Sequence, residues 1–241
     1  MPDNREDRLV EDWRDRTAML IGNKALDRLA HTAVAVFGLG GVGSFTAEAL
    51  ARAGVGRLVL VDGDTVSLTN LNRQLVALHS TLGQSKAEVM ARRVRDINPD
   101  CQVEAHTAYY LPDQPQDFLS GCDFAADCID MVSAKLALAQ ECRDRAIPLI
   151  SAMGCGNKLD PARFKVAPIE KTSVCPLCRV MRRELSRRGI TGVTVVYSDE
   201  PPVRTGGPEN GGRPVPASIS FVPSAAGLLL AGEIVRRLTE D

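Results

Sequence analysis

The sequence predicts an α/β protein built on a mostly parallel β-sheet. Short apolar runs at 33–37, 57–61 and 124–129 alternate with segments of helical periodicity at 44–53 and 86–97. Runs of this length are typical of strands buried on both faces, and the intervening helices connect parallel neighbours. The alternation therefore indicates a doubly wound, Rossmann-like sheet with helices on both of its faces.

The rest of the chain adds a C-terminal elaboration to this sheet. Further elements are expected at five places, namely residues 101–106, 147–151 and 164–168 for strands and 133–145 and 227–238 for helices. Residues 171–197 are expected to hold an arginine-rich helix and another strand, and the Pro- and Gly-rich residues 198–216 predict a mobile loop. The first 30 residues, which are rich in Asp, Glu and Arg, are expected to be helical and exposed.

Composition excludes several classes of protein. The 241 residues are 44% hydrophobic and 24% charged, which is typical of a folded globular protein and argues against disorder, collagen and coiled coil. Aromatic residues make up 4%, too few for a base-stacking platform, and a net charge of −1 excludes a uniformly basic surface. With no signal peptide and no apolar run long enough to span a bilayer, we expect a cytoplasmic protein with reduced thiols and no membrane partner.

A glycine-rich loop joins the first predicted strand to the first predicted helix. It places glycine at four positions, Gly38, Gly40, Gly41 and Gly43. Glycine lets the backbone turn tightly and approach a phosphate, and the following helix directs free N–H groups at the same anion. Asp62 ends the next strand, where an acid can bind ribose hydroxyls. This pattern predicts an adenine nucleotide site, but the loop alone does not separate NAD from ATP.

Residues downstream of this unit favour ATP over NAD. The segment after Asp62 brings five polar or charged residues to the nucleotide end of the sheet, namely Asp64, Asn70, Arg73, Gln74 and Lys86. Cations neutralise the oxygens of a triphosphate and stabilise charge that develops during transfer, whereas a nicotinamide pocket does not need them. Asp130, just past the end of a predicted strand, is placed to hold Mg²⁺ together with the phosphates.

The sequence resembles the ubiquitin-activating-type adenylation superfamily, to which the adenylating enzymes of thiamine and molybdopterin biosynthesis also belong. The motifs that carry this resemblance are Gly38-Leu-Gly-Gly-Val-Gly-Ser44, Asp62-Gly-Asp64, Asn70-Leu-Asn-Arg-Gln74, Gly83-Gln-Ser-Lys86, Ile97-Asn-Pro99 and Asp127-Cys-Ile-Asp130. Within the superfamily it is most similar to the tRNA threonylcarbamoyladenosine dehydratase family. That narrower resemblance covers nearly the whole chain and rests on residues 16–22, 48–56, 151–161, 171–172 and 195–200.

The resemblance implies a role for each matching residue. The glycine loop would cradle ATP, Asp62 would bind its ribose, and Asp130 would hold Mg²⁺. Three residues would hold the triphosphate, namely Asn70, Arg73 and Lys86. Arg16 stands where the superfamily places an arginine that reaches into the site of a second subunit, which implies a homodimer.

The implied reaction is an ATP-driven dehydration. A substrate carboxylate attacks the α-phosphate, pyrophosphate leaves and an acyl-adenylate forms, with no protein nucleophile. In the dehydratase family the carboxylate belongs to threonylcarbamoyladenosine in tRNA, and intramolecular attack then expels AMP and closes a ring. The resemblance also implies a possible sulfur-transfer partner, a cysteine desulfurase or a sulfur acceptor.

Five arginines within ten residues form the one dense basic segment that the sequence shows, namely Arg179, Arg182, Arg183, Arg187 and Arg188. Helical spacing places Arg179, Arg183 and Arg187 on one stripe, which is able to contact phosphates. A solvated helix face explains the same pattern. The resemblance to tRNA-modifying enzymes favours RNA contact.

The seven cysteines support neither a complete zinc site nor an evident nucleophile. Cys175 and Cys178 have zinc-ligand spacing, but no Cys or His follows them and the three histidines lie far upstream. A relic of a zinc site, a redox pair or plain helix-start residues all fit this pair. Cys155 lies in a glycine turn and Cys128 on a predicted strand, and no neighbouring base would lower the pKa of either thiol.

We therefore expect residues 1–241 to form one adenylation domain. Its parts are an N-terminal helical segment (1–30), a nucleotide-binding core (31–157) and a C-terminal elaboration that serves the substrate or a dimer (158–241). Three alternatives remain at this stage: an adenylyltransferase for a ubiquitin-like sulfur carrier, an NAD-dependent oxidoreductase and a non-catalytic nucleotide-binding scaffold. The absence of a second Cys-x-x-Cys pair counts against the first, and the Asn70–Gln74 run counts against the second.

Overall fold

A seven-stranded sheet forms the centre of the molecule. The computed structural model describes residues 12–112, 117–205, 209–210 and 213–240. The strands follow the order β3-β2-β1-β4-β5-β7-β6, and all neighbours are parallel except β6 and β7. Their bounds are β1 (Ala33–Phe37), β2 (Arg57–Val61), β3 (Gln102–His106), β4 (Phe124–Asp127), β5 (Leu149–Ala152), β6 (Phe164–Pro168) and β7 (Thr194–Ser198). The predicted mostly parallel α/β architecture is confirmed.

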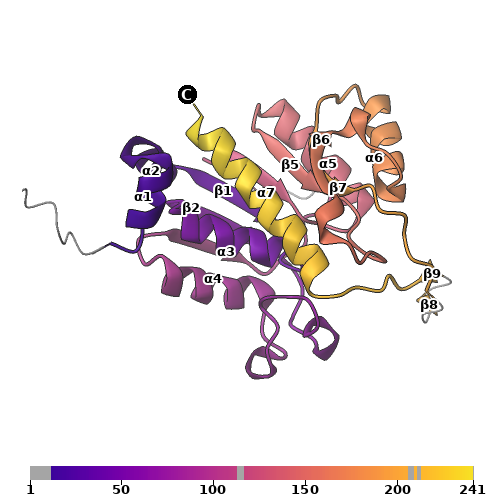
Figure 1. Ribbon diagram of the computed structural model, residues 1–241, viewed down its shortest axis with the longest axis horizontal. Helices are drawn as coiled ribbons and strands as arrows, with labels where there is room; N and C mark the ends of the chain where they lie inside the picture. The colour runs from indigo at the N-terminus through magenta and orange to yellow at the C-terminus, as the bar shows by residue number, and fades with distance from the viewer. Residues whose placement is uncertain (1–11, 113–116, 206–208, 211–212, 241) are drawn as a thin grey trace, which may run out of the picture.

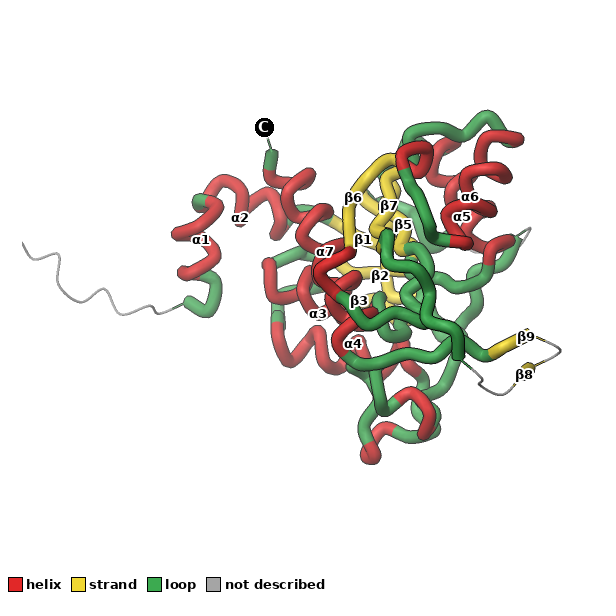
Figure 2. The backbone as a smooth tube through the Cα atoms, turned by 45° about the vertical axis from the view of Figure 1, so that its right-hand side comes forward, coloured by secondary structure: helices red, strands yellow, loops and turns green. Residues whose placement is uncertain are grey.

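Helices pack on both faces of this sheet (Figure 1). One face carries α3 (Gly43–Ala53), α4 (Lys86–Ile97) and α7 (Phe221–Thr239), and the other carries α5 (Val132–Asp144) and α6 (Pro176–Arg187). The N-terminal helices α1 (Asp15–Ile21) and α2 (Asn23–Ala30) lie at one end of the molecule in Figure 2. Among the described residues, no helix is both long and apolar enough to cross a membrane.

The alternation of side chains along β1 divides the core into layers. Val34 and Val36 pack under α3, α4 and α7, whereas Ala35 and Phe37 point to the opposite face. Successive side chains of a strand face opposite sides, so an uninterrupted apolar run is what a strand with both faces covered requires. All five residues of β1 are buried.

Part of the second face is covered by a loop, in addition to α5 and α6. The described residues between β3 and β4 contribute Tyr110 and Phe118 to the core on this face. Both rings pack edge-on against Phe37, with centroids 5.1 and 6.3 Å away. The apolar residues of this loop have no helical or alternating spacing, so periodicity did not reveal it.

Several element boundaries also differ from the prediction. α7 begins at Phe221, six residues before the expected start, because Pro223 lies in the first helical turn, where a missing N–H costs nothing. β4 ends at Asp127, so Cys128 follows the strand instead of lying on it.

The N-terminal segment and the C-terminal loop depart from expectation in part. Residues 1–11 of the predicted helical segment lie outside the described residues, and α2 is not fully exposed, since Ala25 and Leu29 are buried. The predicted mobile loop contains two short paired strands, β8 (Glu209–Asn210) and β9 (Arg213–Pro214). Its residues 206–208 and 211–212 lie outside the described residues.

A buried ion pair joins the end of β4 to α5. Lys135 of α5 has no exposed side-chain surface, and its Nζ lies 2.9 Å from Oδ2 of Asp127. The Ser151 hydroxyl donates to the same oxygen at 2.5 Å, and the backbone N–H of Ile129 donates to Oδ1 at 3.1 Å. Both oxygens of the Asp127 carboxylate thus accept hydrogen bonds, as burial of a charge requires.

Replacing Lys135 by Met tests this pair while keeping most of the side-chain volume. We expect Lys135→Met to lower the free energy of unfolding by about 3–5 kcal/mol, because Asp127 is left buried without its counter-charge. Urea unfolding measures the change. Lys165→Met, which breaks an exposed pair with Asp199, is the matched control and should leave the midpoint nearly unchanged. Equal midpoints for the two variants would contradict the assignment.

Candidate active site

The candidate site lies where the carboxyl ends of the central strands meet. β1 has β2 on one side and β4 on the other, so the chain leaves this point of the sheet in opposite directions. Such a switch point opens a crevice at the carboxyl edge, where ligands of doubly wound sheets bind. The glycine loop follows β1 at this edge, Asp62 follows β2 and Asp130 follows β4 shortly after its last residue.

The glycine loop is shaped by two close approaches of the backbone. Gly38 has a φ of +84°, and a Cβ there would lie 2.8 Å from the carbonyl oxygen of Cys128. A Cβ on Gly43 would lie 1.7 Å from the carbonyl oxygen of Gly38. Only glycine fits at either position, and the tight turn lets α3 start immediately, with its free N–H groups directed to the crevice.

The other two glycines lie beside polar residues of the predicted site. Gly40 has the amide of Gln74 as its nearest neighbour, at 3.7 Å from a built Cβ, and Gly41 has Pro223 and the stem of Arg73 at 3.1 and 3.4 Å. Gln74 is buried, and its Oε1 has no hydrogen-bond partner within the described part of the chain. The fold therefore brings Arg73 and Gln74 against the glycine loop.

Asp62 links the end of β2 to this loop. Its Oδ2 accepts a hydrogen bond from the Leu39 N–H at 2.6 Å, and its Oδ1 accepts one from the Asp64 N–H at 2.8 Å. Burial raises the pKa of Asp62, while the two N–H donors favour its charged form. A carboxylate held at this point retains lone pairs to accept hydroxyl groups of a ribose.

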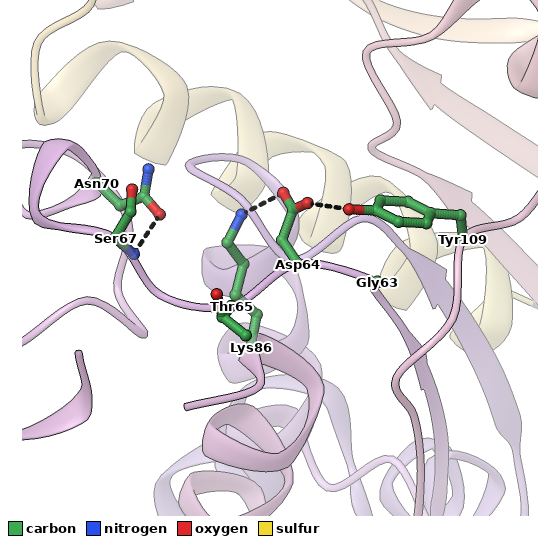
Figure 3. A pocket seen from close by; sticks show the side chains of 7 residues that line it. All are labelled: Gly63, Asp64, Thr65, Ser67, Asn70, Lys86 and Tyr109. Carbon is green, nitrogen blue, oxygen red and sulfur yellow. Dashed lines mark hydrogen bonds and ion pairs between the residues drawn. The ribbon is translucent and has the colours of Figure 1, made fainter. Parts of the chain in front are cut away.

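A pocket of about 390 Å³ opens beside Asp62 (Figure 3). Its lining residues are Gly63, Asp64, Thr65, Ser67, Asn70, Lys86 and Tyr109. Lys86 is almost fully buried, and its Nζ lies 2.7 Å from Oδ2 of Asp64. The Tyr109 hydroxyl donates to Oδ1 of Asp64 at 2.6 Å. Burial opposes ionisation of Asp64, but the hydrogen bonds from Lys86 and Tyr109 lower its pKa below the usual range.

Two more of the predicted residues have local partners. Asn70 is buried, and its Oδ1 accepts a hydrogen bond from the Ser67 N–H at 3.1 Å. Arg73 is half-buried, and its Nη1 donates to the Thr69 carbonyl at 3.0 Å and to Oδ1 of Asn72 at 2.8 Å. Both residues come from the turn that contains the short 3₁₀ helix Leu68–Asn70, so one local segment positions them.

Asp130 is exposed just beyond the end of β4. The buried Asp127 accepts the Ile129 N–H and so orients the backbone that carries Asp130. An exposed carboxylate at this edge of the sheet is a group able to hold Mg²⁺, which is usually bound by one or two carboxylates together with phosphates and water.

Arg16 is the one predicted site residue that this chain does not bring to the crevice. It is exposed on α1, and Arg14 of the preceding turn lies near Gly54, at the C-terminal end of α3. The glycine loop is at the other end of this eleven-residue helix, roughly 16 Å away along its axis.

Sequence reasoning missed Tyr109 and Lys135. Tyr109 packs over Gly63, where a Cβ would lie 2.7 Å from its ring, and donates to Asp64. Its position soon after the end of β3, at the same sheet edge as Asp62, was the available signal. Lys135 gave none, because a lysine in a helical pattern is usually exposed.

Burial disfavours both of the cysteines considered as nucleophiles. Burial raises the pKa of Cys128 and of Cys155 to about 12, so both are protonated thiols at neutral pH. Cys175 and Cys178 are buried at the start of α6. Among the described residues, no group of three or more His, Cys, Asp or Glu is placed to hold a metal ion.

The glycine loop at the switch point, the acid after β2 and the buried lysine beside it define a nucleotide-binding protein of the doubly wound class. The chain belongs to the ThiF family, whose model matches residues 14–241.

Relatives of known activity are similar to this chain over most of its length. The tRNA threonylcarbamoyladenosine dehydratase of Bacillus subtilis (strain 168) is 46% identical over 239 residues, which cover 94% of both chains. The Escherichia coli (strain K12) protein of the same name is 42% identical over 200 residues, covering 78% of this chain and 75% of the relative. The crystal structure of an E. coli tRNA N6-threonylcarbamoyladenosine dehydratase with ATP matches with a TM-score of 0.85 and 37% identity, covering 95% and 96% of the two chains.

Gly43 offers a direct test of the loop geometry. We expect Gly43→Ala to lower the thermal unfolding midpoint and to abolish the further stabilisation that ATP gives, because the new Cβ collides with the Gly38 carbonyl. The matched control is Gly232→Ala in α7, where, within the described part of the chain, no atom beyond the neighbouring helix backbone lies within 4 Å of a built Cβ. Alanine there gains up to about 1 kcal/mol of helix propensity. An unaltered ATP-dependent shift in Gly43→Ala would contradict this account.

Proposed function

We propose that this protein is an ATP-dependent dehydratase that adenylates the carboxylate of threonylcarbamoyladenosine in tRNA and then cyclises it. The observation that carries the proposal is the similarity to dehydratases along nearly the whole chain, including one solved with ATP. This similarity favours the dehydratase over the adenylyltransferase for a sulfur carrier. A tRNA substrate agrees with the expected cytoplasmic location.

The residues at the crevice bind and orient ATP. The N–H groups at the start of α3 and the glycine loop face the phosphates, and Asp62 accepts the ribose hydroxyls. Lys86 and Arg73 neutralise phosphate oxygens as the substrate carboxylate attacks the α-phosphate and pyrophosphate leaves. Asp130 would hold Mg²⁺, which would supply further neutralisation of the phosphates when bound.

The second half of the reaction needs no protein nucleophile. The acyl-adenylate places a good leaving group, AMP, on the former carboxylate carbon. Attack from within the same modified nucleoside forms the new ring bond and breaks the bond to AMP, which leaves with one oxygen of the carboxylate. The protein contributes by holding the two groups in register and excluding water. This agrees with the protonated state of Cys128 and Cys155.

ATP–pyrophosphate exchange tests the proposed function. We expect exchange and AMP release to require tRNA that carries threonylcarbamoyladenosine, and a carrier protein with a Gly-Gly tail to give neither. Lys86→Ala should lower kcat/KM by about 10²–10³-fold, because it removes a charge that stabilises the transition state. Lys24→Ala, on α2, is the control with unchanged rate. Exchange driven by the carrier protein would overturn the proposal in favour of the alternative.

We further propose that the active unit is a homodimer in which Arg16 completes the site of a second subunit. α1 has no buried residue, and Met19 and Leu20 on it are 77% and 84% exposed. Such side chains gain stability when a second copy covers them. Arg16 comes from the same helix and lies far from the glycine loop of its own chain.

Complementation tests the contribution of Arg16 between subunits. Arg16→Ala and Lys86→Ala are each expected to be nearly inactive. Mixing them under subunit exchange should restore about a quarter of wild-type activity, because about half of the dimers are mixed and each of these has one complete site. Steady-state AMP release measures the recovery. No recovery, with mixed dimers shown by mass spectrometry, would contradict the role of Arg16.

The exposed arginines of α6 are a candidate tRNA contact. Arg183 and Arg187 are 65% and 66% exposed, and Arg179 is exposed on the same helix. Glu184 binds three arginines of this helix, namely Arg183, Arg187 and Arg188. Arg179, Arg183, Arg187 and Arg188 together carry more charge than Glu184 neutralises, so the surface keeps a net positive charge suited to phosphates.

A triple substitution tests this surface. We expect Arg179→Ala/Arg183→Ala/Arg187→Ala to weaken tRNA binding. The slope of log K against log[salt] should become smaller in magnitude by about 2–3, because three phosphate contacts are lost. A control triple, Arg52→Ala/Arg95→Ala/Arg236→Ala, removes equal charge from helices on the other sheet face. Filter binding at several salt concentrations measures both. An unchanged slope in the α6 triple would exclude this surface as a tRNA contact.

A cysteine desulfurase or sulfur acceptor as a further partner stays a prediction of the resemblance.

A further inference from the structure

Two cysteines lie together at the first turn of α6. Cys175 is the N-cap residue of the helix, and Cys178 follows three residues later in the sequence Cys175-Pro-Leu-Cys178. Both are free thiols, and both are buried. The two thiol groups are close enough to share a hydrogen bond. The pair is thus placed to close a disulfide, which joins sulfurs of neighbouring side chains.

The two thiols are chemically different from each other and from the remaining cysteines. A hydrogen bond from Cys178 lowers the pKa of Cys175 to about 5, against the opposing effect of burial, and N–H groups of Gly154 and Leu177 add to this. Burial raises the pKa of Cys101 to about 11. Cys175 is therefore a thiolate at neutral pH and Cys178 keeps the shared proton, as in reactive Cys-x-x-Cys pairs at helix starts.

The residue before this pair is in a strained conformation. Val174 has a φ of +62°, which is rare for a β-branched residue. The N–H of Cys175 donates to the Ser173 carbonyl at 2.6 Å and closes a three-residue turn around Val174, a turn type that is rare and strained. Val174 itself is 46% exposed. Opening of this turn exposes Cys175 to small solutes, and relief of strain favours the opening.

Cys178 has the surroundings that a resolving thiol needs. Nη1 of Arg182 donates to the hydroxyl oxygen of Thr172 at 2.9 Å. In the reduced pair the hydrogen bond to Cys175 and burial raise the pKa of Cys178, whereas the Arg182 guanidinium favours its thiolate. Once Cys175 is oxidised and no longer charged, the effect of that hydrogen bond is removed and Arg182 assists the loss of the Cys178 proton.

We propose that Cys175 and Cys178 form a redox-active dithiol that hydrogen peroxide oxidises to an intramolecular disulfide. The Cys175 thiolate attacks one peroxide oxygen, the O–O bond breaks, and a sulfenic acid and hydroxide form; the hydroxide leaves to solvent, where the buffer protonates it. Cys178 then attacks the Cys175 sulfur, the S–O bond breaks, and the departing hydroxide takes the Cys178 proton and leaves as water. Two electrons from the two sulfurs reduce one peroxide, and a thiol reductant reverses the change.

Peroxide titration of the reduced whole protein tests this site. Trypsin releases residues 172–179 as one peptide that contains both cysteines. On oxidation, this peptide should lose two hydrogens and no longer react with an alkylating agent. We expect its oxidation to be at least about tenfold faster than that of Cys101 and Cys122, because those two thiols are protonated. Dithiothreitol should restore alkylation at both positions. Oxidation of all cysteines at one common rate would overturn the proposal.

Two variants separate the roles of the pair. Cys178→Ser should accumulate a sulfenic acid at Cys175 that a 1,3-dione traps, whereas Cys175→Ser should give no adduct at Cys178. Absence of the adduct in a folded Cys178→Ser protein would overturn the assignment. Stoichiometric zinc in the reduced wild-type protein, lost in Cys178→Ser, would also overturn it and identify a metal ligand pair instead.

A pH series on the wild-type protein needs no variant. Alkylation of Cys175 should change little between pH 7 and pH 6, because a thiol with a pKa of about 5 is ionised at both. Alkylation of Cys101 should fall about tenfold over the same interval, since its thiolate fraction falls by that factor. A tenfold fall at Cys175 would contradict the proposal.

Discussion

The close approach of the β1–α3 loop to the backbone after β4 is the constraint on which the nucleotide edge depends. Gly38 leaves no room for a side chain against the carbonyl of Cys128, and Gly43 leaves none against the carbonyl of Gly38. Because these spaces are empty, the N–H of Cys128 reaches the Phe37 carbonyl at 2.8 Å and α3 starts within six residues of β1. The free N–H groups of α3 and the carboxylate after β4 therefore share one crevice.

The parts of the fold that follow from periodicity were predicted from the sequence almost residue by residue. The bounds of β1, β2, β6 and α4 agree with the prediction, because each is a short apolar run or a helix with a capping serine. The covering loop with Tyr110 and Phe118 was not predicted, since its apolar residues have no regular spacing. α7 starts earlier than predicted because Pro223 lies in its first turn, where a missing N–H costs nothing.

The sequence predicted those residues of the candidate site that lie close to one another along the chain. Asp62, Arg73 and Gln74 lie against the glycine loop. Asn70 and Lys86, from the same continuous segment, line the pocket beside Asp62. Tyr109 was missed because it acts through Asp64, which is distant in sequence. Lys135 was missed because a lysine in a helical pattern is usually exposed. What makes Cys175 distinctive, a hydrogen-bonded thiolate behind a strained turn, is also a matter of three-dimensional contacts. The spacing alone left a zinc relic, a redox pair and a plain helix start equally open.

The ion pair between Lys86 and Asp64 has a consequence for the energetics of binding. Lys86 is buried, so its charge needs a partner even when no phosphate is present, and Asp64 supplies one. A phosphate that binds to Lys86 replaces the Asp64 carboxylate as the partner of its ammonium group. The binding free energy is therefore the difference between a Lys86–phosphate contact and a Lys86–carboxylate contact, which are similar. In the proposed reaction, the Asp64 carboxylate is within reach to take the place of the departing pyrophosphate. The pair would then limit how tightly that product is held, which favours turnover over retention.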